Sequence, residues 1–152
     1  MTVTWTPGPG VVEMPDGTRF RGRALREPLP GGLAPDYGVY LLGRAPDPVP
    51  WDSTWLRWPD FRLPTEPQRA IDVLRAAHAR AQHERVEVAC GGGRGRTGTA
   101  LACLAVFAGV PPQDAIDYVR AAYHPRAVET PFQKRFVRRC SAGRPPLPPD
   151  HT

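Results

Sequence analysis

The 152-residue sequence lacks a recognisable export signal at its start and a long apolar run, and these two absences argue against an exported protein and against a membrane-spanning one. Residues 1–10 carry neither the basic start nor the apolar stretch that a secretory signal peptide requires. The longest apolar segment, Ala100–Val110, contains a glycine and falls short of the ~18 consecutive apolar residues that a membrane helix needs. We therefore expect a cytoplasmic protein without a membrane span.

Cysteine is also scarce, because the chain holds only Cys90, Cys103 and Cys140. Without an export signal there is no reason to expect a disulfide. The wide spacing of the three thiols matches no zinc-binding pattern, so we expect no metal. Cys103 fits the core face of a helix, and nothing in the sequence supports a redox pairing of Cys140 with Cys90. At least one free thiol therefore needs a chemical explanation.

Lysine is nearly absent, since Lys134 is the only lysine among 20 basic residues. The net charge of +5 and the high content of proline and glycine then indicate a bias in composition as much as a binding surface. No compact run of basic residues is interleaved with aromatic residues, so we do not expect nucleic-acid binding. A basic surface would still help to attract a phosphorylated substrate.

Short β-favouring runs separated by turn-forming residues fill the first third of the chain. The predicted strands are Thr2–Trp5, Thr18–Leu25, Gly38–Leu42 and Ser53–Trp58, and Val86–Ala89 is a further strand. Helices are predicted from Thr65, over Thr97–Ala108, over Pro112–Tyr123 and from Thr130. The first helix is expected to begin with a capping box formed by Thr65 and Gln68.

This order predicts a single α/β domain over residues 1–140, with a central mixed sheet flanked by helices. The proline-rich tail, residues 141–152, is predicted to be disordered.

One short loop joins the strand Val86–Ala89 to the apolar helix Thr97–Ala108. Cys90 begins it, Arg96 ends it, and four of the five residues between them are glycine. Glycines let the backbone curl so that successive N–H groups point into one concavity, and the helix that follows adds its positive N-terminal end. A cysteine in that field is favoured as a thiolate, and arginine can bind two phosphoryl oxygens with its planar fork. The loop therefore predicts an oxyanion site with a built-in nucleophile.

Three other interpretations compete. Cys90 alone could be a buried strand residue. Gly93–Gly98 fits the dinucleotide pattern G-x-G-x-x-G, but no strand ending in an acidic residue follows at the distance that this pattern requires. A Walker loop fails, because Cys90 stands at its first glycine and Arg96 at its lysine. None of these explains a cysteine and an arginine at the two ends of one loop.

The segment Cys90–Gly98 resembles the signature loop of the protein tyrosine phosphatase superfamily, C-x-x-G-x-G-R-[ST]-G, with every fixed position filled. The resemblance implies that Cys90 is the nucleophile, that Thr97 donates a hydrogen bond to its sulfur when the sulfur becomes the leaving group, and that no cofactor takes part. The implied phosphate-binding residues are Gly91, Gly92, Gly93, Arg94, Gly95 and Arg96.

Two further segments extend the resemblance to residues 58–137, about half of the chain. Trp58-Pro59-Asp60 is similar to the family's mobile acid loop, which makes Asp60 the general acid that protonates the leaving oxygen. Glu129–Gln133 is similar to the family's glutamine loop, which implies that Gln133 orients the hydrolytic water. Thr130 and Gln133 also make a capping box, and both roles are compatible.

The sequence departs from the family pattern at several points. Ala89 stands where the family has a histidine that supports the loop and its thiolate. No counterpart of the tyrosine-recognition loop is found, which predicts an open pocket. Arg94 is basic at a position where phosphoinositide-directed relatives carry a basic residue.

The resemblance therefore implies a protein tyrosine phosphatase of the compact tyrosine or dual-specificity type, acting as a monomer on phosphorylated proteins. Phosphotyrosine is the expected substrate, with phosphoserine and phosphothreonine as further ones. The alternatives are a phosphatase for phosphoinositides or other small molecules, and an inactive phosphate-binding module.

Overall fold

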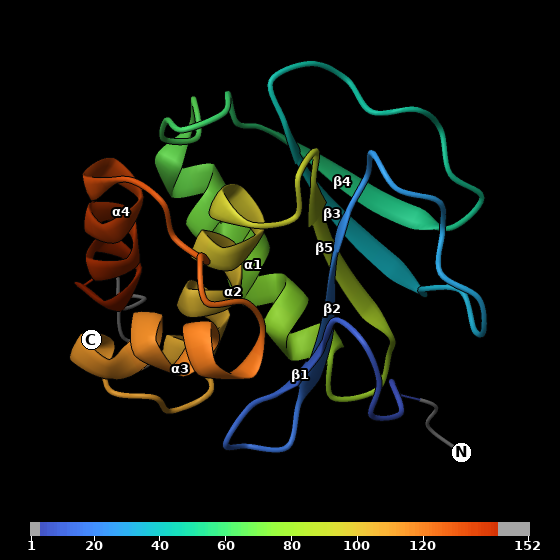
Figure 1. Cartoon of the computed structure of the whole chain (residues 1–152), viewed down its shortest axis with the longest axis horizontal. Coiled ribbons are helices and arrows are strands. Elements are labelled where there is room, and N and C mark those ends of the chain that lie inside the picture. The colour runs from blue at the N-terminus through green and yellow to red at the C-terminus, as the bar shows by residue number, and fades with distance from the viewer. Residues whose placement is uncertain (1–3, 143–152) are drawn as a thin grey trace, which may run out of the picture.

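The computed structural model describes residues 4–142, and its core is a five-stranded mixed sheet (Figure 1). The strands are β1 (Val11–Glu13), β2 (Arg19–Ala24), β3 (Tyr37–Leu42), β4 (Asp52–Arg57) and β5 (Val86–Cys90), in the order β1-β2-β5-β3-β4. Only β1 runs antiparallel to its neighbour. The carboxyl ends of the four parallel strands therefore meet at one edge, with β5 central.

The helices lie on one side of the sheet, and loops cover the other side (Figure 1). They are α1 (Pro67–Arg80), α2 (Gly95–Phe107), the short 3₁₀ helix η1 (Pro112–Asp114), α3 (Ala115–Ala122) and α4 (Pro131–Ala142). Every residue of α2 from Gly95 to Ala105 is buried, as its apolar sequence predicts. The predicted α/β domain with a central mixed sheet is confirmed.

The structure near the N-terminus differs from the prediction in two ways. Thr4 and Trp5 lie in no strand, since the Trp5 indole instead donates a hydrogen bond to the Val86 carbonyl at 2.8 Å. The other two residues of that predicted strand, Thr2 and Val3, lie outside the described residues. The short strand β1 was not predicted.

The predicted capping box at the start of α1 does not form. Thr65 donates its hydroxyl to the Arg57 carbonyl at 3.3 Å, and the Gln68 amide donates to Asp72 at 3.0 Å. The helix begins at Pro67, a residue suited to a first turn because it has no N–H to satisfy.

At the other end of the chain, Ser141 and Ala142 belong to α4. The remainder of the tail that was predicted to be disordered, residues 143–152, lies outside the described residues.

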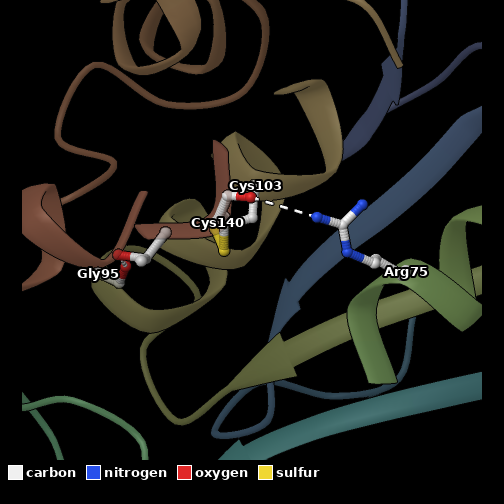
Figure 2. Close-up of a disulfide and its surroundings, with 5 residues drawn as sticks. Arg75, Gly95, Cys103 and Cys140 are labelled. Carbon is white, nitrogen blue, oxygen red and sulfur yellow. Dashed lines mark hydrogen bonds between the residues drawn. A yellow bond between two sulfur atoms is a disulfide. The ribbon is translucent and has the colours of Figure 1, made fainter. Parts of the chain in front are cut away.

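Two of the three cysteines form a disulfide, which corrects the prediction of free thiols. Cys103 on α2 and Cys140 on α4 are both fully buried and bonded, with Cα atoms 5.7 Å apart (Figure 2). The Arg75 guanidinium on α1 donates a hydrogen bond to the Cys140 carbonyl at 3.5 Å. The disulfide links α4 to α2 covalently and leaves Cys90 as the free cysteine.

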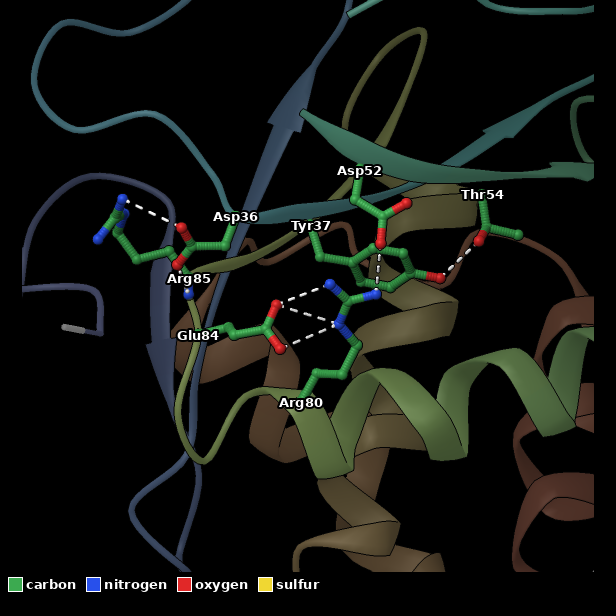
Figure 3. A network of polar contacts seen from close by, with 7 residues as sticks. All are labelled: Asp36, Tyr37, Asp52, Thr54, Arg80, Glu84 and Arg85. Carbon is green, nitrogen blue, oxygen red and sulfur yellow. Dashed lines mark hydrogen bonds and ion pairs between the residues drawn. The ribbon is translucent and has the colours of Figure 1, made fainter. Parts of the chain in front are cut away.

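A polar network closes the edge of the sheet opposite the strands' carboxyl ends (Figure 3). Arg80, at the end of α1, pairs with Glu84 at 2.7 Å and with Asp52 of β4 at 2.8 Å. Its guanidinium also lies over the Tyr37 ring of β3 at 3.9 Å. Hydrogen bonding to Glu84 raises the pKa of Arg80, so the guanidinium keeps its charge. The network ties the helix layer to two strands of the sheet.

A buried ionic cluster organises the face of the sheet that carries no helices. Glu87 of β5 is completely buried and contacts Arg21 at 2.6 Å, Arg23 at 2.8 Å and the Tyr40 hydroxyl at 2.9 Å. Burial, followed by the charge of Glu87, raises the pKa of Tyr40. Because these partners lie on β2, β3 and β5, one carboxylate joins the three central strands.

Replacing Glu87 by Gln should destabilise the fold strongly, because two buried guanidinium groups would lose their shared anion. We expect the free energy of unfolding, measured by urea titration, to fall by about 3–5 kcal/mol. The matched control, Glu84→Gln, breaks a partly exposed pair and should cost no more than about 1 kcal/mol. Equal losses in the two variants would contradict a structural role for the buried cluster.

Candidate active site

A cavity of about 250 Å³ opens at the carboxyl edge of the sheet, where β4 and β5 end. Its lining comes from four separate stretches of chain: Arg26, Asp60, Phe61, Cys90, Gly92, Arg94, Gly95, Arg96 and Glu129. The fold therefore brings Asp60, Cys90 and Arg96 together, as the motifs predict. Arg26 and Glu129 are additions that the sequence interpretation did not assign to the site.

Cys90 ends β5 at the base of the loop and is 2% exposed. The Gly93 N–H donates a hydrogen bond to its sulfur at 3.2 Å, and α2 begins at Gly95. Gly93 has a φ of +71°, and a Cβ there would lie 2.8 Å from the Ala24 nitrogen. This position therefore requires glycine, because a side chain would both strain the backbone and collide with β2.

Tyr123, just after α3, braces the same loop from outside the cavity. Its hydroxyl donates a hydrogen bond to the Gly93 carbonyl at 2.5 Å. Gly22 of β2 leaves room for the ring, since a Cβ there would lie 2.6 Å from Tyr123 Cε1. Burial, and then the nearby Cys90, raise the pKa of Tyr123, so the hydroxyl keeps its proton for this bond. Because a trans peptide points its C=O and N–H in opposite directions, the bond also fixes the Arg94 N–H.

Arg96 is a buried cation at the start of α2, with 5% of its surface exposed. Its Nη1 donates to the Trp58 carbonyl at 3.0 Å, and its Nε lies 3.5 Å from Asp60 Oδ1. The Trp58-Pro59-Asp60 segment thus lies directly against the arginine of the Cys90 loop.

Asp60 is 44% exposed at its side chain and faces the cavity. Its Oδ1 accepts a hydrogen bond from the Phe61 N–H at 3.0 Å. Phe61 has a φ of +61°, an uncommon backbone conformation for a residue with a side chain. Phe61 is half exposed and lines the cavity next to the carboxylate of Asp60.

The buried side-chain nitrogen and oxygen atoms without a hydrogen-bond partner within residues 4–142 are Arg96 Nε, Thr97 Oγ1 and Gln133 Nε2. Thr97 therefore makes no hydrogen bond to the Cys90 sulfur in this structure, and its predicted role toward the leaving sulfur stays a prediction. Buried polar atoms are rarely left unpaired, and all three occur at or next to the Cys90 loop. This concentration of unused polar groups marks a binding site rather than ordinary core.

The two polar side chains at the ends of the segment Glu129–Gln133 lie in different environments: Glu129 lines the cavity and Gln133 is buried away from it. Gln133 is fully buried, and its Oε1 accepts hydrogen bonds from the N–H groups of Glu129 at 2.7 Å and Thr130 at 3.3 Å. The Gln133 N–H in turn donates to the Thr130 hydroxyl at 3.2 Å, so the predicted capping box is present. Gln133 does not line the cavity.

Glu129 is the residue of that segment that lines the cavity. A Cβ on Gly95 would collide with Glu129 Oε1, so the carboxylate lies close against the first residue of α2. Its place within the glutamine-loop segment was the available signal, but the sequence could not show which side chain of the segment faces inward.

Comparison with known proteins places these features in a family. Residues 53–141, more than half of the chain, match the family described as "Swiss Army Knife protein, DSP-PTPase phosphatase domain", abbreviated PTP-SAK. Two uncharacterized proteins of Methanocaldococcus jannaschii are similar in sequence. MJ0215 is 31% identical over 121 residues, 68% of this chain and 75% of its own. MJECL20 is 40% identical over 78 residues, about half of each chain.

Two solved structures share the fold. Tk-PTP in its active form superposes with a TM-score of 0.68 at 22% identity, over 89% of this chain and 98% of its own. Kinase associated phosphatase, with its catalytic-site cysteine replaced by serine, gives a TM-score of 0.53 at 19% identity, over 61% and 55% of the two chains. The predicted membership of the protein tyrosine phosphatase superfamily is thereby confirmed.

Removing the Tyr123 hydroxyl should weaken oxyanion binding. The backbone peptide group between Gly93 and Arg94, which carries the Arg94 N–H, would lose the hydrogen bond that fixes its orientation. We expect Tyr123→Phe to raise the Kd for inorganic phosphate about threefold to tenfold, the loss of one hydrogen bond, as measured by calorimetry. Tyr118→Phe is the matched control, since its hydroxyl donates to the Glu13 carbonyl at 2.6 Å, away from the loop. An unchanged Kd in Tyr123→Phe would show that the brace does not shape the anion site.

Proposed function

Because the chain belongs to the PTP-SAK family of DSP-type phosphatase domains, we propose that it hydrolyses phosphate monoesters through a covalent phospho-cysteine at Cys90. The observation that carries the proposal is the convergence of Cys90, Arg96 and Asp60 on one 250 Å³ cavity at the N-terminus of α2. The substrate that we propose is phosphotyrosine in proteins.

In the first step the Cys90 thiolate attacks phosphorus, forming the S–P bond as the P–O bond to the leaving group breaks. The Gly93 N–H lies 3.2 Å from the Cys90 sulfur and α2 begins at Gly95, so both are placed to favour the attacking charge on sulfur in this step. Arg96 and the amides of Gly91–Arg96 are proposed to bind the equatorial oxygens of the phosphoryl group. Such donors stabilise the transition state because they are already in place when charge shifts.

Asp60 is proposed to donate its proton to the leaving oxygen. Its carboxyl is solvent-accessible at the cavity, while Oδ1 lies 3.5 Å from Arg96 Nε and so shares the site of the phosphoryl group. A positioned acid is worth ~10²–10⁴-fold in rate, and it matters most for a poor leaving group such as the tyrosine oxygen.

In the second step, water attacks phosphorus and gives a proton to the Asp60 carboxylate, which lost its own proton in the first step, while the S–P bond breaks and returns the thiolate. We propose that Glu129, rather than Gln133, contacts this water, because Glu129 lines the cavity and Gln133 does not. Gln133 would then act through Glu129, whose N–H it accepts at 2.7 Å. Thr97 is proposed to donate its unpaired hydroxyl to the sulfur as it leaves.

The preference for an aromatic phosphate rests on Phe61. This residue lines the cavity, is 54% exposed and follows Asp60 directly in the chain. Aromatic rings pack favourably edge-to-face or offset, so Phe61 offers a surface for the ring of a phosphotyrosine.

Hydrolysis of p-nitrophenyl phosphate in the presence of EDTA tests the proposed function. The natural protein should turn over in the chelator, and Cys90→Ser should abolish turnover because serine is not ionised in this site. Circular dichroism on both proteins checks that the variant is folded. Activity that is equal in Cys90→Ser would overturn Cys90 as the nucleophile, and a folded natural protein without turnover would favour an inactive phosphate-binding module.

Glu129 can be separated from Gln133 by burst kinetics. If Glu129 contacts the attacking water, Glu129→Ala should slow dephosphorylation about 10–100-fold and give a burst of p-nitrophenol. This loss is at or below the lower end of the ~10²–10⁴-fold that a positioned acid or base typically contributes. Gln133→Ala should mainly destabilise the protein through the lost helix cap, by about 1 kcal/mol. The reverse pattern, a burst only in Gln133→Ala, would return the catalytic role to the glutamine.

A further inference from the structure

A second, larger cavity of about 540 Å³ adjoins the catalytic one, and the two share Arg26 and Arg96. It lies beyond the carboxyl ends of β2 and β3, between the chain segments 25–29 and 44–49. Outside the catalytic loop its lining includes Arg23, Arg26 and Arg44 together with the apolar Leu25, Leu29 and Val49. A volume of this size is typical of a ligand site.

The floor of this cavity carries excess positive charge. The Arg23 side chain is 11% exposed, and its Nε binds Glu87 at 2.8 Å. Glu87 is also the carboxylate that pairs with Arg21 at 2.6 Å. One buried anion therefore serves two guanidinium groups, and the surplus charge lies beneath the cavity. An anionic group of a ligand in this cavity would be attracted by the guanidinium charge of Arg23, which is screened little by water because the side chain is mostly buried.

The rim adds two arginines that have no anionic partner of their own. Within residues 4–142, neither Arg26 nor Arg44 makes an ion pair or a side-chain hydrogen bond, although Arg19, Arg80 and Arg85 all do so. Glu27 and Asp47 line the same cavity but form no ion pair with the arginines of the described chain. Two exposed guanidinium groups are thus available to a ligand.

The Arg26 guanidinium lies where it can contact a substrate group directly beside the phosphate that is cleaved. Its backbone N–H donates to the Gly91 carbonyl at 3.2 Å, which fixes it to the Cys90 loop. Its Nε and Nη2 lie 3.4 Å from where a Cβ on Gly91 would be, and its Nη1 lies 3.8 Å from the corresponding position on Gly92. The guanidinium therefore lies over the loop, at the boundary between the two cavities.

We propose that Arg26 and Arg44 form a subsite for a second anionic group of the substrate, one residue or so from the phosphotyrosine. This proposal rests on the proposed function, and it names the substrate class as phosphotyrosine segments with an acidic or phosphorylated neighbour. The apolar side chains of the cavity, among them Leu25, Leu29 and Val49, suit the aliphatic part of such a neighbouring residue.

The subsite can be tested by binding, without any need for turnover. Three probes are titrated into Cys90→Ser at low salt: a phosphotyrosine peptide with neutral neighbours, the same peptide with glutamate on both sides, and a water-soluble inositol bisphosphate. We expect the acidic peptide to bind about fivefold to tenfold more tightly than the neutral one, an advantage that shrinks as salt is added.

Adding Arg26→Gln and Arg44→Gln to Cys90→Ser should bring the ratio of the two peptide Kd values close to one. The matched control, Arg139→Gln, removes an exposed arginine of α4 that lines neither cavity and should preserve the ratio. A ratio near one without the substitutions, or one that survives both of them, would overturn the subsite. Tighter binding of the inositol bisphosphate than of either peptide would instead assign the cavity to a small phosphorylated molecule.

Turnover of p-nitrophenyl phosphate by the natural protein is measured alongside. If the natural protein shows no turnover while the acidic peptide still binds more tightly than the neutral one, the proposed chemistry alone is overturned. Turnover with no peptide preference would overturn the subsite alone.

Discussion

The buried guanidinium of Arg96 is the constraint on which the site depends. A cation removed from water is stable only where hydrogen bonds and anions compensate it, and Arg96 is 5% exposed. Within the described chain it has one backbone hydrogen bond, to Trp58, and a more distant carboxylate, Asp60. The glycine-rich loop and the N-terminus of α2 add further positive potential at the same point. This arrangement favours an anion at that point, as the proposed function requires.

The fold supplies the rigidity that this arrangement requires. Cys90 ends the central strand β5, and α2 is buried along most of its length, so the loop between them is held at both ends. Glu87 fixes β5 to its neighbours from one face of the sheet, while the Cys103–Cys140 disulfide holds α2 to α4 on the other. The parallel strands then deliver Arg26 and Asp60 to the same edge, because their carboxyl ends lie together.

The sequence was informative wherever a function depends on a short, continuous segment. Cys90, Arg96 and the loop between them could be predicted, because strand, glycines and helix follow one another directly, and Asp60 was found through its own motif. The disulfide, the Tyr123 brace and the position of Arg26 could not be predicted, because each depends on packing between distant segments. The place of Glu129 at the cavity could not be predicted for a related reason: it shares one segment with Gln133, and only the packing of that segment decides which side chain lines the cavity.

The most direct test of the covalent mechanism is to look for the phospho-cysteine itself. The protein would be mixed with p-nitrophenyl phosphate, quenched within the first turnovers and digested, and the peptide containing Cys90 analysed by mass spectrometry. The account predicts that this peptide carries one phosphoryl group on sulfur during turnover and loses it once the substrate is consumed. Turnover with an unmodified Cys90 at every time, or with phosphate on another residue, would contradict it.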